Sequence, residues 1–212
     1  MHHVMFDVDG TLVESYDFDG KCYVDAVYSV LGHHLNSDWR KYNNVTDAGI
    51  LDQHIEEHGL HSEREKIHID VKAVFIRNIS NHLKENPVRQ IQGASEFIDV
   101  LRGIGNLSIS IATGGWYETA ILKLHSANID ISGIPIASSD NHFSRIEIMK
   151  IAEEKAKVKK SEYRTYFGDA EWDRKASLEL GFNFVLVGDR TNHNQSIPDY
   201  SNTYRALEYI GV

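Results

Sequence analysis

Two carboxylates stand one residue apart near the start of the chain, directly after a short apolar run. Asp7 and Asp9 follow Val4-Met5-Phe6, and Gly10 comes next. A short apolar run closed by a glycine is typical of a buried strand, and side chains i and i+2 of a strand point to the same side. We therefore expect both carboxylates to project from the carboxyl end of this strand, where open parallel sheets bind ligands.

A hard cation would relieve the repulsion between these two carboxylates. When two unpaired carboxylates lie close together, one pKa rises unless a cation or a hydrogen-bond donor lies between them. Mg²⁺ takes oxygen ligands and usually pairs with a phosphate group. The run alone leaves a simpler alternative open, namely a strand followed by an ordinary Asp-Gly turn.

Two later apolar runs also end in groups that suit phosphate chemistry. Thr113-Gly114-Gly115 follows one of them, just before a predicted helix. A hydroxyl and backbone N–H groups freed by glycine could cradle an oxyanion or phosphate, or Thr113 could simply cap the helix. Asp169 ends a further strand and Asp173 lies four residues on, so both could face one site. Helix capping and helix-dipole charges are the alternative for this pair.

In their order along the chain, these motifs resemble the haloacid dehalogenase-like (HAD) hydrolase superfamily. The run Asp7-Val8-Asp9-Gly10-Thr11-Leu12-Val13 looks like the family's first motif, DxDGT(L/V). Thr113 stands in the place of the second motif, and the GDxxxD run from Gly168 to Asp173 closely matches the fourth. The resemblance covers essentially the whole chain, although it is much weaker between residues 15 and 87.

The third motif of the family departs from its usual pattern in this chain. The family normally has a lysine at or near a helix start, whereas Arg145 stands at the corresponding helix start here and Lys150 lies five residues on. Arginine can supply the charge and grip phosphate with two hydrogen bonds. Positions five apart in a helix do not share a face. We therefore favour Arg145 over Lys150, with a solvated surface cation as the alternative for either residue.

The resemblance implies a Mg²⁺-dependent phosphatase that acts on a small phosphorylated metabolite. Asp7 would attack phosphorus and form an aspartyl-phosphate, while Asp9 would act as general acid and base. The implied Mg²⁺ ligands are Asp7, the backbone carbonyl of Asp9, Asp169 and, directly or through the second shell of contacts, Asp173. Thr113 and Arg145 would bind the phosphate oxygens, with Gly114 and Gly115 as further substrate contacts. A sugar-phosphate mutase on the same core, or a regulatory protein that binds a phosphorylated ligand without turnover, remains an alternative.

Strand and helix patterns alternate along most of the chain, which predicts a Rossmann-like α/β core with a mostly parallel sheet. After the first strand, further strands are expected at 107–113, 134–137, 163–167 and 184–187. Helices are expected between them, including one from 144 to about 158, and a last one near 204–210. Residues 1–14 and 88–212 should form this core domain.

Residues 15–87 show helical periodicity without a strand pattern, which predicts a small all-helical cap domain inserted between the first and second motifs. Helix starts are expected at Asp19, at Thr46 and at a capping box that begins with Ser62. By the resemblance, this module closes over the site and selects the substrate. Thr46 and Asp47, at one of its helix starts, are therefore expected to face the substrate.

Histidines are frequent in the predicted cap. His54 and His58 are spaced four residues apart and His61 is nearby, so a surface metal site is conceivable. Without a matching pattern of acidic partners, we favour a solvated helix face for these residues.

Composition narrows the class of protein further. The net charge of -9 over 212 residues argues against a nucleic-acid partner held by phosphate contacts. No apolar run approaches the roughly 20 residues of a membrane span. Cys22 is the only cysteine, so that an internal disulfide is impossible and a reducing compartment fits. With no signal-peptide pattern, we expect a cytoplasmic monomer or homodimer.

Overall fold

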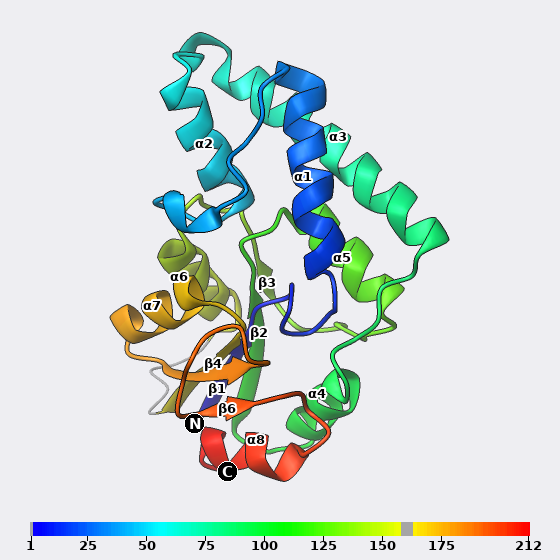
Figure 1. Cartoon of the computed structure of the whole chain (residues 1–212). Helices are drawn as coiled ribbons and strands as arrows, with labels where there is room; N and C mark the ends of the chain where they lie inside the picture. Colours follow the sequence, from blue (N-terminus) through cyan, green and yellow to red (C-terminus); the bar gives the residue numbers. More distant parts are fainter. Residues whose placement is uncertain (1, 158–162) are drawn as a thin grey trace.

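Six parallel strands form one sheet at the centre of the computed structural model, which describes residues 2–157 and 163–212 (Figure 1). The strand order is β3-β2-β1-β4-β5-β6. The strands are β1 (His2–Phe6), β2 (Leu107–Ala112), β3 (Ile136–Ala137), β4 (Tyr163–Gly168), β5 (Asn183–Val187) and β6 (Ser196–Ile197). The order of connections reverses between β1 and β4, and sheets of this kind bind ligands in the crevice outside the carboxyl ends at such a reversal. The predicted Rossmann-like α/β fold is confirmed.

Helices cover both faces of this sheet and create two separate apolar cores. The helices are α4 (Ala94–Arg102), α5 (Tyr117–Ser126), α6 (Arg145–Lys155), α7 (Glu171–Leu180) and α8 (Thr203–Ile210). Phe6 of β1 belongs to a core to which α4, α5 and α8 contribute, and the neighbouring Met5 belongs to a core with α6 and α7. A strand buried on both faces must be apolar almost throughout, which explains the continuous apolar run at the start of the chain.

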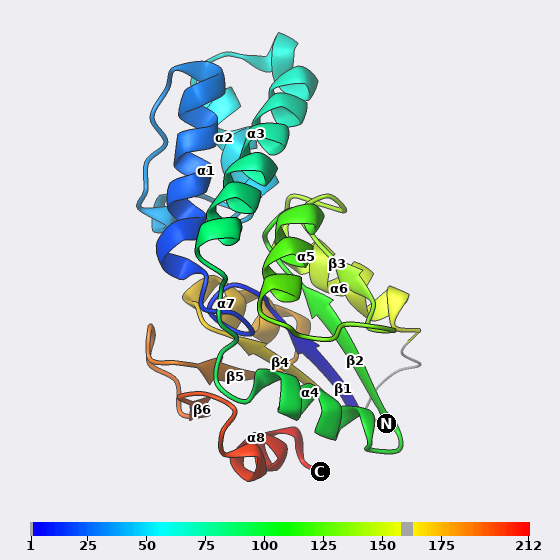
Figure 2. The ribbon, with the colours of Figure 1, turned by 90° about the vertical axis from the view of Figure 1, so that its right-hand side faces the viewer.

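Three further helices stand beyond the carboxyl ends of the central strands, on the side opposite to α4 and α8 (Figures 1 and 2). They are α1 (Tyr16–Leu31), α2 (Asp47–Glu57) and α3 (Arg64–Glu85), joined by the short 3₁₀ helices η1 (Trp39–Lys41) and η2 (His61–Glu63). Tyr23 and Val27 of α1 are buried with Val71 and Phe75 of α3. Residues 15–87, all of them described, contain no strand, as their periodicity predicts.

The structure agrees with some predicted helix starts and corrects others. Thr46 caps α2 as expected, because its side chain accepts a hydrogen bond from the Gly49 N–H at 3.0 Å. Asp19 is not a cap, since α1 begins three residues earlier and Asp19 lies in its first turn. The capping box at Ser62 is also wrong, because η2 covers that residue and α3 begins at Arg64 without a side-chain cap.

Strand β6 and the end of α6 differ from the predicted elements or lie beyond what can be compared with them. Strand β6 was not predicted, because two residues are too few to show a strand pattern. The end of the helix expected near residue 158 lies outside the described residues, and α6 ends at Lys155. None of the helices within the two described ranges is long and apolar enough to cross a membrane.

Candidate active site

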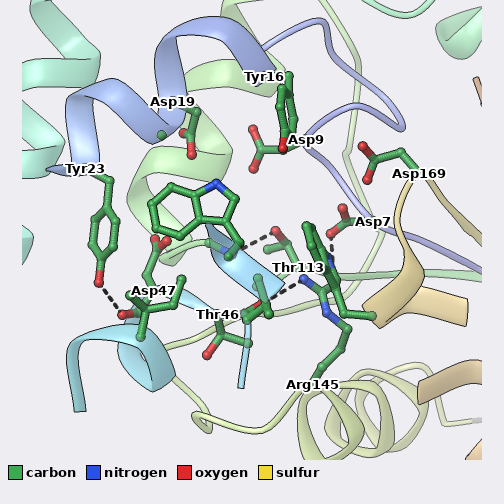
Figure 3. A pocket seen from close by; sticks show the side chains of 17 residues that line it. Asp7, Asp9, Tyr16, Asp19, Tyr23, Thr46, Asp47, Thr113, Arg145 and Asp169 are labelled. Atoms are coloured by element: carbon green, nitrogen blue, oxygen red, sulfur yellow. Dashed lines mark hydrogen bonds and ion pairs between the residues drawn. The ribbon is translucent and has the colours of Figure 1, made fainter. Parts of the chain in front are cut away.

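Asp7 lies at the carboxyl end of β1, next to the end of β4. Its backbone N–H donates to the Phe167 carbonyl at 3.0 Å, which continues the hydrogen bonding of the two strands. At Gly10 the chain turns away with a φ of +75°, and a Cβ there would overlap the Asp169 carboxylate. Glycine therefore allows both the turn and the close approach of the β4 aspartate. Asp7, Asp9 and Asp169 line one cavity (Figure 3).

Asp7, Asp169 and Asp173 form a buried acidic cluster at this point. Each offers a carboxylate oxygen, and the three oxygens lie within 4.8 Å of one another. Burial, and then the charge of Asp173, raise the pKa of Asp7 to about 7. Burial and the charge of Asp7 likewise raise the pKa of Asp169 to about 7. Three carboxylates supply only oxygen donors, which Mg²⁺ prefers, so these residues fit the ion that the family implies.

Asp173 is held in this cluster by protein donors. Its Oδ2 accepts a hydrogen bond from the Ala170 N–H at 3.1 Å, and its Oδ1 accepts one from the Tyr166 hydroxyl at 3.3 Å. A Cβ on Gly168 would lie 2.7 Å from the Cβ of Asp173, so glycine is needed where β4 runs into α7. Burial raises the pKa of Asp173 to about 6, even though Arg145 lies 2.8 Å from its Oδ1.

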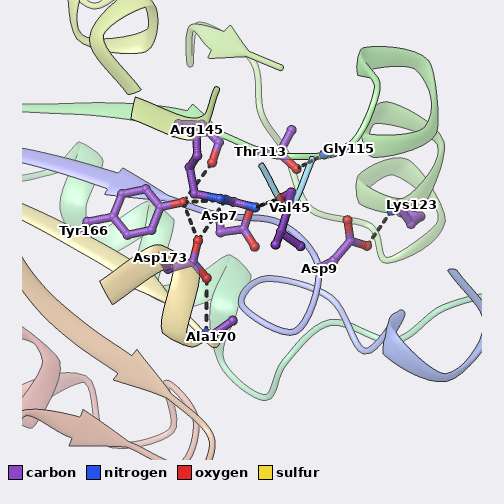
Figure 4. A network of polar contacts seen from close by, with 11 residues as sticks. Asp7, Asp9, Val45, Thr113, Gly115, Lys123, Arg145, Tyr166, Ala170 and Asp173 are labelled. Carbon is purple, nitrogen blue, oxygen red and sulfur yellow. Dashed lines mark hydrogen bonds and ion pairs between the residues drawn. The ribbon is translucent and has the colours of Figure 1, made fainter. Parts of the chain in front are cut away.

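Arg145, the first residue of α6, lies beside Asp7 of the first motif (Figure 4). Its Nη1 lies 3.3 Å from Asp7 Oδ1, and its Nη2 donates to the Val45 carbonyl at 3.3 Å. Lys150 behaves differently, because it is exposed and pairs with Glu147 at 2.7 Å. Arg145 is therefore the cation of α6 that contacts Asp7.

The Thr-Gly-Gly run follows β2 and lines the same cavity. Thr113 Oγ1 accepts a hydrogen bond from the Gly115 N–H at 3.1 Å, which closes a small turn. A Cβ on Gly114 would crowd Nη2 of Arg145 and lie 3.0 Å from the Val45 carbonyl oxygen. The glycine at position 114 thus lets α6 and the helical segment approach the end of β2.

Thr46 and Asp47 bring α2 to the cavity wall. The Thr46 hydroxyl donates to the Phe143 carbonyl at 2.6 Å, and Asp47 Oδ2 accepts from the Trp116 N–H at 2.8 Å. The Asp47 N–H donates to the Gly114 carbonyl at 2.8 Å. Both residues line the cavity, and contact with a substrate stays a prediction for them. Their polar atoms also fasten α2 to the core.

Lys123 is a site residue that the sequence motifs missed. It lies on α5 with only 1% of its surface exposed, and its Nζ donates to Asp9 Oδ1 at 2.5 Å and to Asp19 Oδ1 at 2.7 Å. The Ser15 hydroxyl also donates to Asp9 Oδ1. The helical spacing could have indicated that Lys123 is buried. It follows the buried Ala120 by three residues and so shares the inward face of α5.

Arg190 is a second residue that no motif indicated. It follows β5 in a loop, and its Nη1 donates to Asp169 Oδ2 at 2.8 Å. Its guanidinium carbon lies 3.1 Å from the centre of the Tyr16 ring, at the start of α1. Arg190 therefore connects the acidic cluster to the helical segment.

Comparison with known proteins identifies a matching family and solved structures of similar fold. A family model described as haloacid dehalogenase-like hydrolase matches residues 4–187. The solved β-phosphoglucomutase of Clostridium difficile is 15% identical with a TM-score of 0.74, over 99% of this chain and 97% of that one. CbbY from Rhodobacter sphaeroides in complex with phosphate is 15% identical with a TM-score of 0.73, over 100% of both chains.

A putative phosphoglycolate phosphatase of Lactobacillus plantarum is 17% identical with a TM-score of 0.65, over 98% of both chains. A search of the curated proteins found no significant match. At these levels of identity, the solved structures show a shared fold.

Proposed function

The chain belongs to the haloacid dehalogenase-like hydrolases, and we propose that it is a Mg²⁺-dependent phosphatase that acts on a small phosphorylated metabolite. One observation carries the proposal. Asp7 lies at the end of β1 between the buried guanidinium of Arg145 and the carboxylate of Asp169, all on the wall of one cavity. A nucleophile, a cation for phosphate and an acidic metal cluster thus meet where a substrate can enter.

The residues of the chain suit a two-step transfer. Asp7 attacks phosphorus, the bond to the leaving oxygen breaks, and an aspartyl-phosphate forms. Asp9 gives the leaving oxygen its proton and then takes a proton from a water molecule. That water attacks phosphorus, the bond to Asp7 breaks, and inorganic phosphate leaves. Arg145 and Thr113, with the N–H groups that follow Thr113, bind the phosphoryl oxygens.

The two oxygens of Asp9 suit this exchange of protons. Oδ1 accepts hydrogen bonds from Lys123 and Ser15, whereas Oδ2 lies on the side of Gly115, toward the cavity. One oxygen is therefore anchored while the other faces the substrate. When bound, Mg²⁺ would be held by Asp7, Asp169 and the Asp9 carbonyl and would offset the phosphate charge. Asp173, whose oxygens accept hydrogen bonds from the Tyr166 hydroxyl and the Ala170 N–H, then supports this group without binding the ion directly.

Residues 15–87 are proposed to act as a cap that selects the substrate. Tyr16, Asp19, Tyr23, Trp39 and Thr46 from this segment line the cavity together with the motif residues of the core. The cavity measures about 110 Å³. A single water needs roughly 10–15 Å³ on such a measure, so there is room for a phosphate group with a short carbon skeleton. The cap contacts therefore favour small phosphate esters.

The phosphatase proposal is tested by phosphate release from a panel of small phosphate esters, with and without EDTA. We expect turnover that requires Mg²⁺ and falls to background in Asp7→Asn. Asp99→Asn is the matched control, because it makes the same change on an exposed side chain of α4. Wild-type turnover in Asp7→Asn would remove Asp7 from the mechanism. Phosphate binding without turnover of any ester would favour a regulatory protein.

A sugar-phosphate mutase is the second candidate, because β-phosphoglucomutase has the same fold over nearly the whole chain. The same panel separates the two activities when it includes hexose phosphates. A mutase moves the phosphate to another carbon of the sugar, whereas a phosphatase releases inorganic phosphate.

A further inference from the structure

Three histidines meet at the side of the helical segment, and none of them lines the catalytic cavity. His33 follows the end of α1, while His54 and His58 lie one turn apart on α2. One ring nitrogen of each residue lies within 4.8 Å of the other two. The centre of the His58 ring is 4.0 Å from that of His54 and 4.5 Å from that of His33. Tertiary packing thus joins residues 21 positions apart into one cluster.

Two nitrogens in this cluster are buried without a hydrogen-bond partner. They are Nδ1 of His33 and Nε2 of His54, and only 3% of the surface of His54 is exposed. Buried polar atoms are nearly always paired, because an unpaired one loses its hydration without compensation. A bound cation would supply the missing partner for both nitrogens.

The third histidine is arranged as a metal ligand usually is. Nδ1 of His58 lies 2.8 Å from the His54 carbonyl oxygen, which can only accept, so this nitrogen carries the proton. The lone pair is then on Nε2, and a backbone carbonyl that fixes the tautomer in this way is typical around metal-binding histidines. His58 is exposed, which gives an ion access from solvent.

The chemistry of the cluster selects the type of ion. Imidazole nitrogens suit Zn²⁺ and related transition-metal ions, whereas Mg²⁺ requires oxygen ligands. Two histidines four residues apart on one helix face are a recurrent pair of zinc ligands.

We propose that His33, His54 and His58 form a Zn²⁺ site, with water in the fourth position, separate from the acidic cluster of the active site. Each Zn–N bond would be about 2.0–2.1 Å long. The ion would tie the end of α1 to α2 and so close the chain between them. The sequence left a site with His61 open but favoured a solvated helix face, which is wrong for His54 because only 3% of its surface is exposed. His61 lies outside the cluster, 3.9 Å from Glu56.

The proposal is tested by titrating the full-length protein with Zn²⁺ in excess Mg²⁺, which keeps the acidic cluster occupied. We expect stoichiometric binding to the wild type and to His61→Gln, the matched control on the neighbouring exposed histidine. Loss of a residue that only supports a metal ligand costs ~10–100-fold in metal affinity. His58→Gln removes a ligand itself, so its affinity for Zn²⁺ should fall by at least this factor. Co²⁺ should give the strong visible absorption of tetrahedral coordination in the wild type and lose it in His58→Gln.

Further variants identify the site that binds the ion. His33→Gln should behave as His58→Gln, which keeps the test valid if the buried His54→Gln does not fold. Absence of stoichiometric zinc binding by the wild type would overturn the proposal. Equal zinc affinity in the wild type, His33→Gln and His58→Gln would also overturn it. Zinc binding that disappears only in Asp169→Asn would overturn it too, because such binding belongs to the acidic cluster.

Discussion

Asp7 and Asp9 contact two different buried cations (Figure 4). Arg145 approaches Asp7 from α6, and Lys123 approaches Asp9 from α5. Removing one partner of a buried ion pair leaves an uncompensated charge and typically costs 3–5 kcal/mol, so each carboxylate depends on its cation. We infer a division of tasks in which Arg145 serves the nucleophile and its phosphoryl group, and Lys123 fixes the acid and base.

Arg145 is predicted to be essential although the family normally has lysine there. Arg145→Ala should lower kcat/KM by about 10²–10³-fold at saturating Mg²⁺, as the loss of other preorganised electrostatic groups does. Arg145→Lys should recover part of the loss, because it restores the charge but not the bidentate geometry. Lys150→Ala is the control, since Lys150 pairs with Glu147 on the exposed face of the same helix. A crippled Lys150→Ala beside a nearly normal Arg145→Ala would show that the third motif is assigned wrongly.

Lys123 is predicted to act as a positioning residue through Asp9. Lys123→Met should lower kcat by roughly 10²-fold or more, within the range of lost acid–base catalysis. The loss should be smaller for an aryl phosphate than for an alkyl phosphate, because the aryl leaving group needs less protonation. In an Asp9→Asn background, Lys123→Met should have little further effect, since the two residues form one unit. Additive losses, or equal losses for both esters, would mean that Lys123 has a structural role only.

At the scale of elements, polar contacts from several helices fasten the helical segment to the core. Lys123 of α5 reaches Asp19 of α1, and Lys72 of α3 reaches Glu118 of α5 at 2.8 Å. Backbone groups add to these links, as in the hydrogen bond from the Thr46 hydroxyl to the Phe143 carbonyl. The wall of the cavity therefore depends on how α1, α2 and α3 sit on the core.

The sequence indicates the core strands and the strand-end residues because both are local signals. Asp7, Thr113 and Asp169 each come directly after the last residue of a strand, so the strand pattern and the parallel topology suffice to bring them together. The partners of these residues are not local. Lys123 and Arg190 belong to no motif, and their contacts arise only when distant elements pack.

The histidine cluster also depends on a contact between distant elements that the sequence does not reveal. The spacing of His54 and His58 is visible in the sequence, but the third member comes from the end of another helix. His61 is near in the chain and left a local site open, with a solvated helix face favoured, whereas the folded chain brings His33 to His54 and His58. Spacing within one helix is thus readable, and contacts between helices are not.

Strand β1 carries a buried histidine that should make folding sensitive to acid. His3 Nδ1 lies 2.8 Å from Ser108 Oγ, and its Nε2 lies 3.1 Å from Ser110 Oγ on β2. Burial, and then the charge of Arg164, lower the pKa of His3 from 6.5 to about 4. Between these pH values the unfolded chain binds more protons than the folded one. The stability that His3 contributes is therefore complete above pH 6.5 and is lost as the pH falls toward 4.

At about 1.4 kcal/mol per pKa unit, this shift amounts to about 3 kcal/mol in the free energy of unfolding. Urea unfolding at pH 7.5 and pH 5 measures the loss. In His3→Gln, whose side chain can bond the same serines but does not titrate, the loss between the two pH values should be smaller by about 2 kcal/mol, because pH 5 lies above the folded-state pKa of about 4. The same pH dependence in both proteins would exclude His3 as its source.

At the scale of the whole molecule, acidic side chains are concentrated in the cavity where we propose that phosphate binds. Among the described residues that line the cavity, Arg145 is the one cation, whereas five are aspartates. They are Asp7, Asp9, Asp19, Asp47 and Asp169. The chain as a whole carries a net charge of -9. An anionic substrate would be repelled unless a metal ion reverses the local field, so Mg²⁺ and phosphate binding should be linked.

The acidic cluster of Asp7, Asp169 and Asp173 predicts how Mg²⁺ should affect the stability of the protein at different pH values. The pKa values of Asp7 and Asp169 rise from 3.8 to about 7, chiefly through burial. Between about pH 4 and pH 7, the folded protein keeps protons that the unfolded chain has lost. Without a cation, the stability contributed by these protons is present below pH 4 and is lost as the pH rises through 7. Mg²⁺ binds the deprotonated carboxylates and competes with these protons, so its stabilising effect should grow over this window.

We expect saturating Mg²⁺ to raise Tm more at pH 8 than at pH 5. A concentration 100 times the dissociation constant adds about 2.7 kcal/mol, which corresponds to roughly 5–10 °C for a chain of this size. In Asp169→Asn both the shift in Tm and its pH dependence should largely vanish, whereas Asp99→Asn, on the exposed face of α4, should retain them. Thermal unfolding followed by circular dichroism gives these values without any substrate. An equal shift at both pH values, or a full shift in Asp169→Asn, would place the effect of Mg²⁺ outside the acidic cluster.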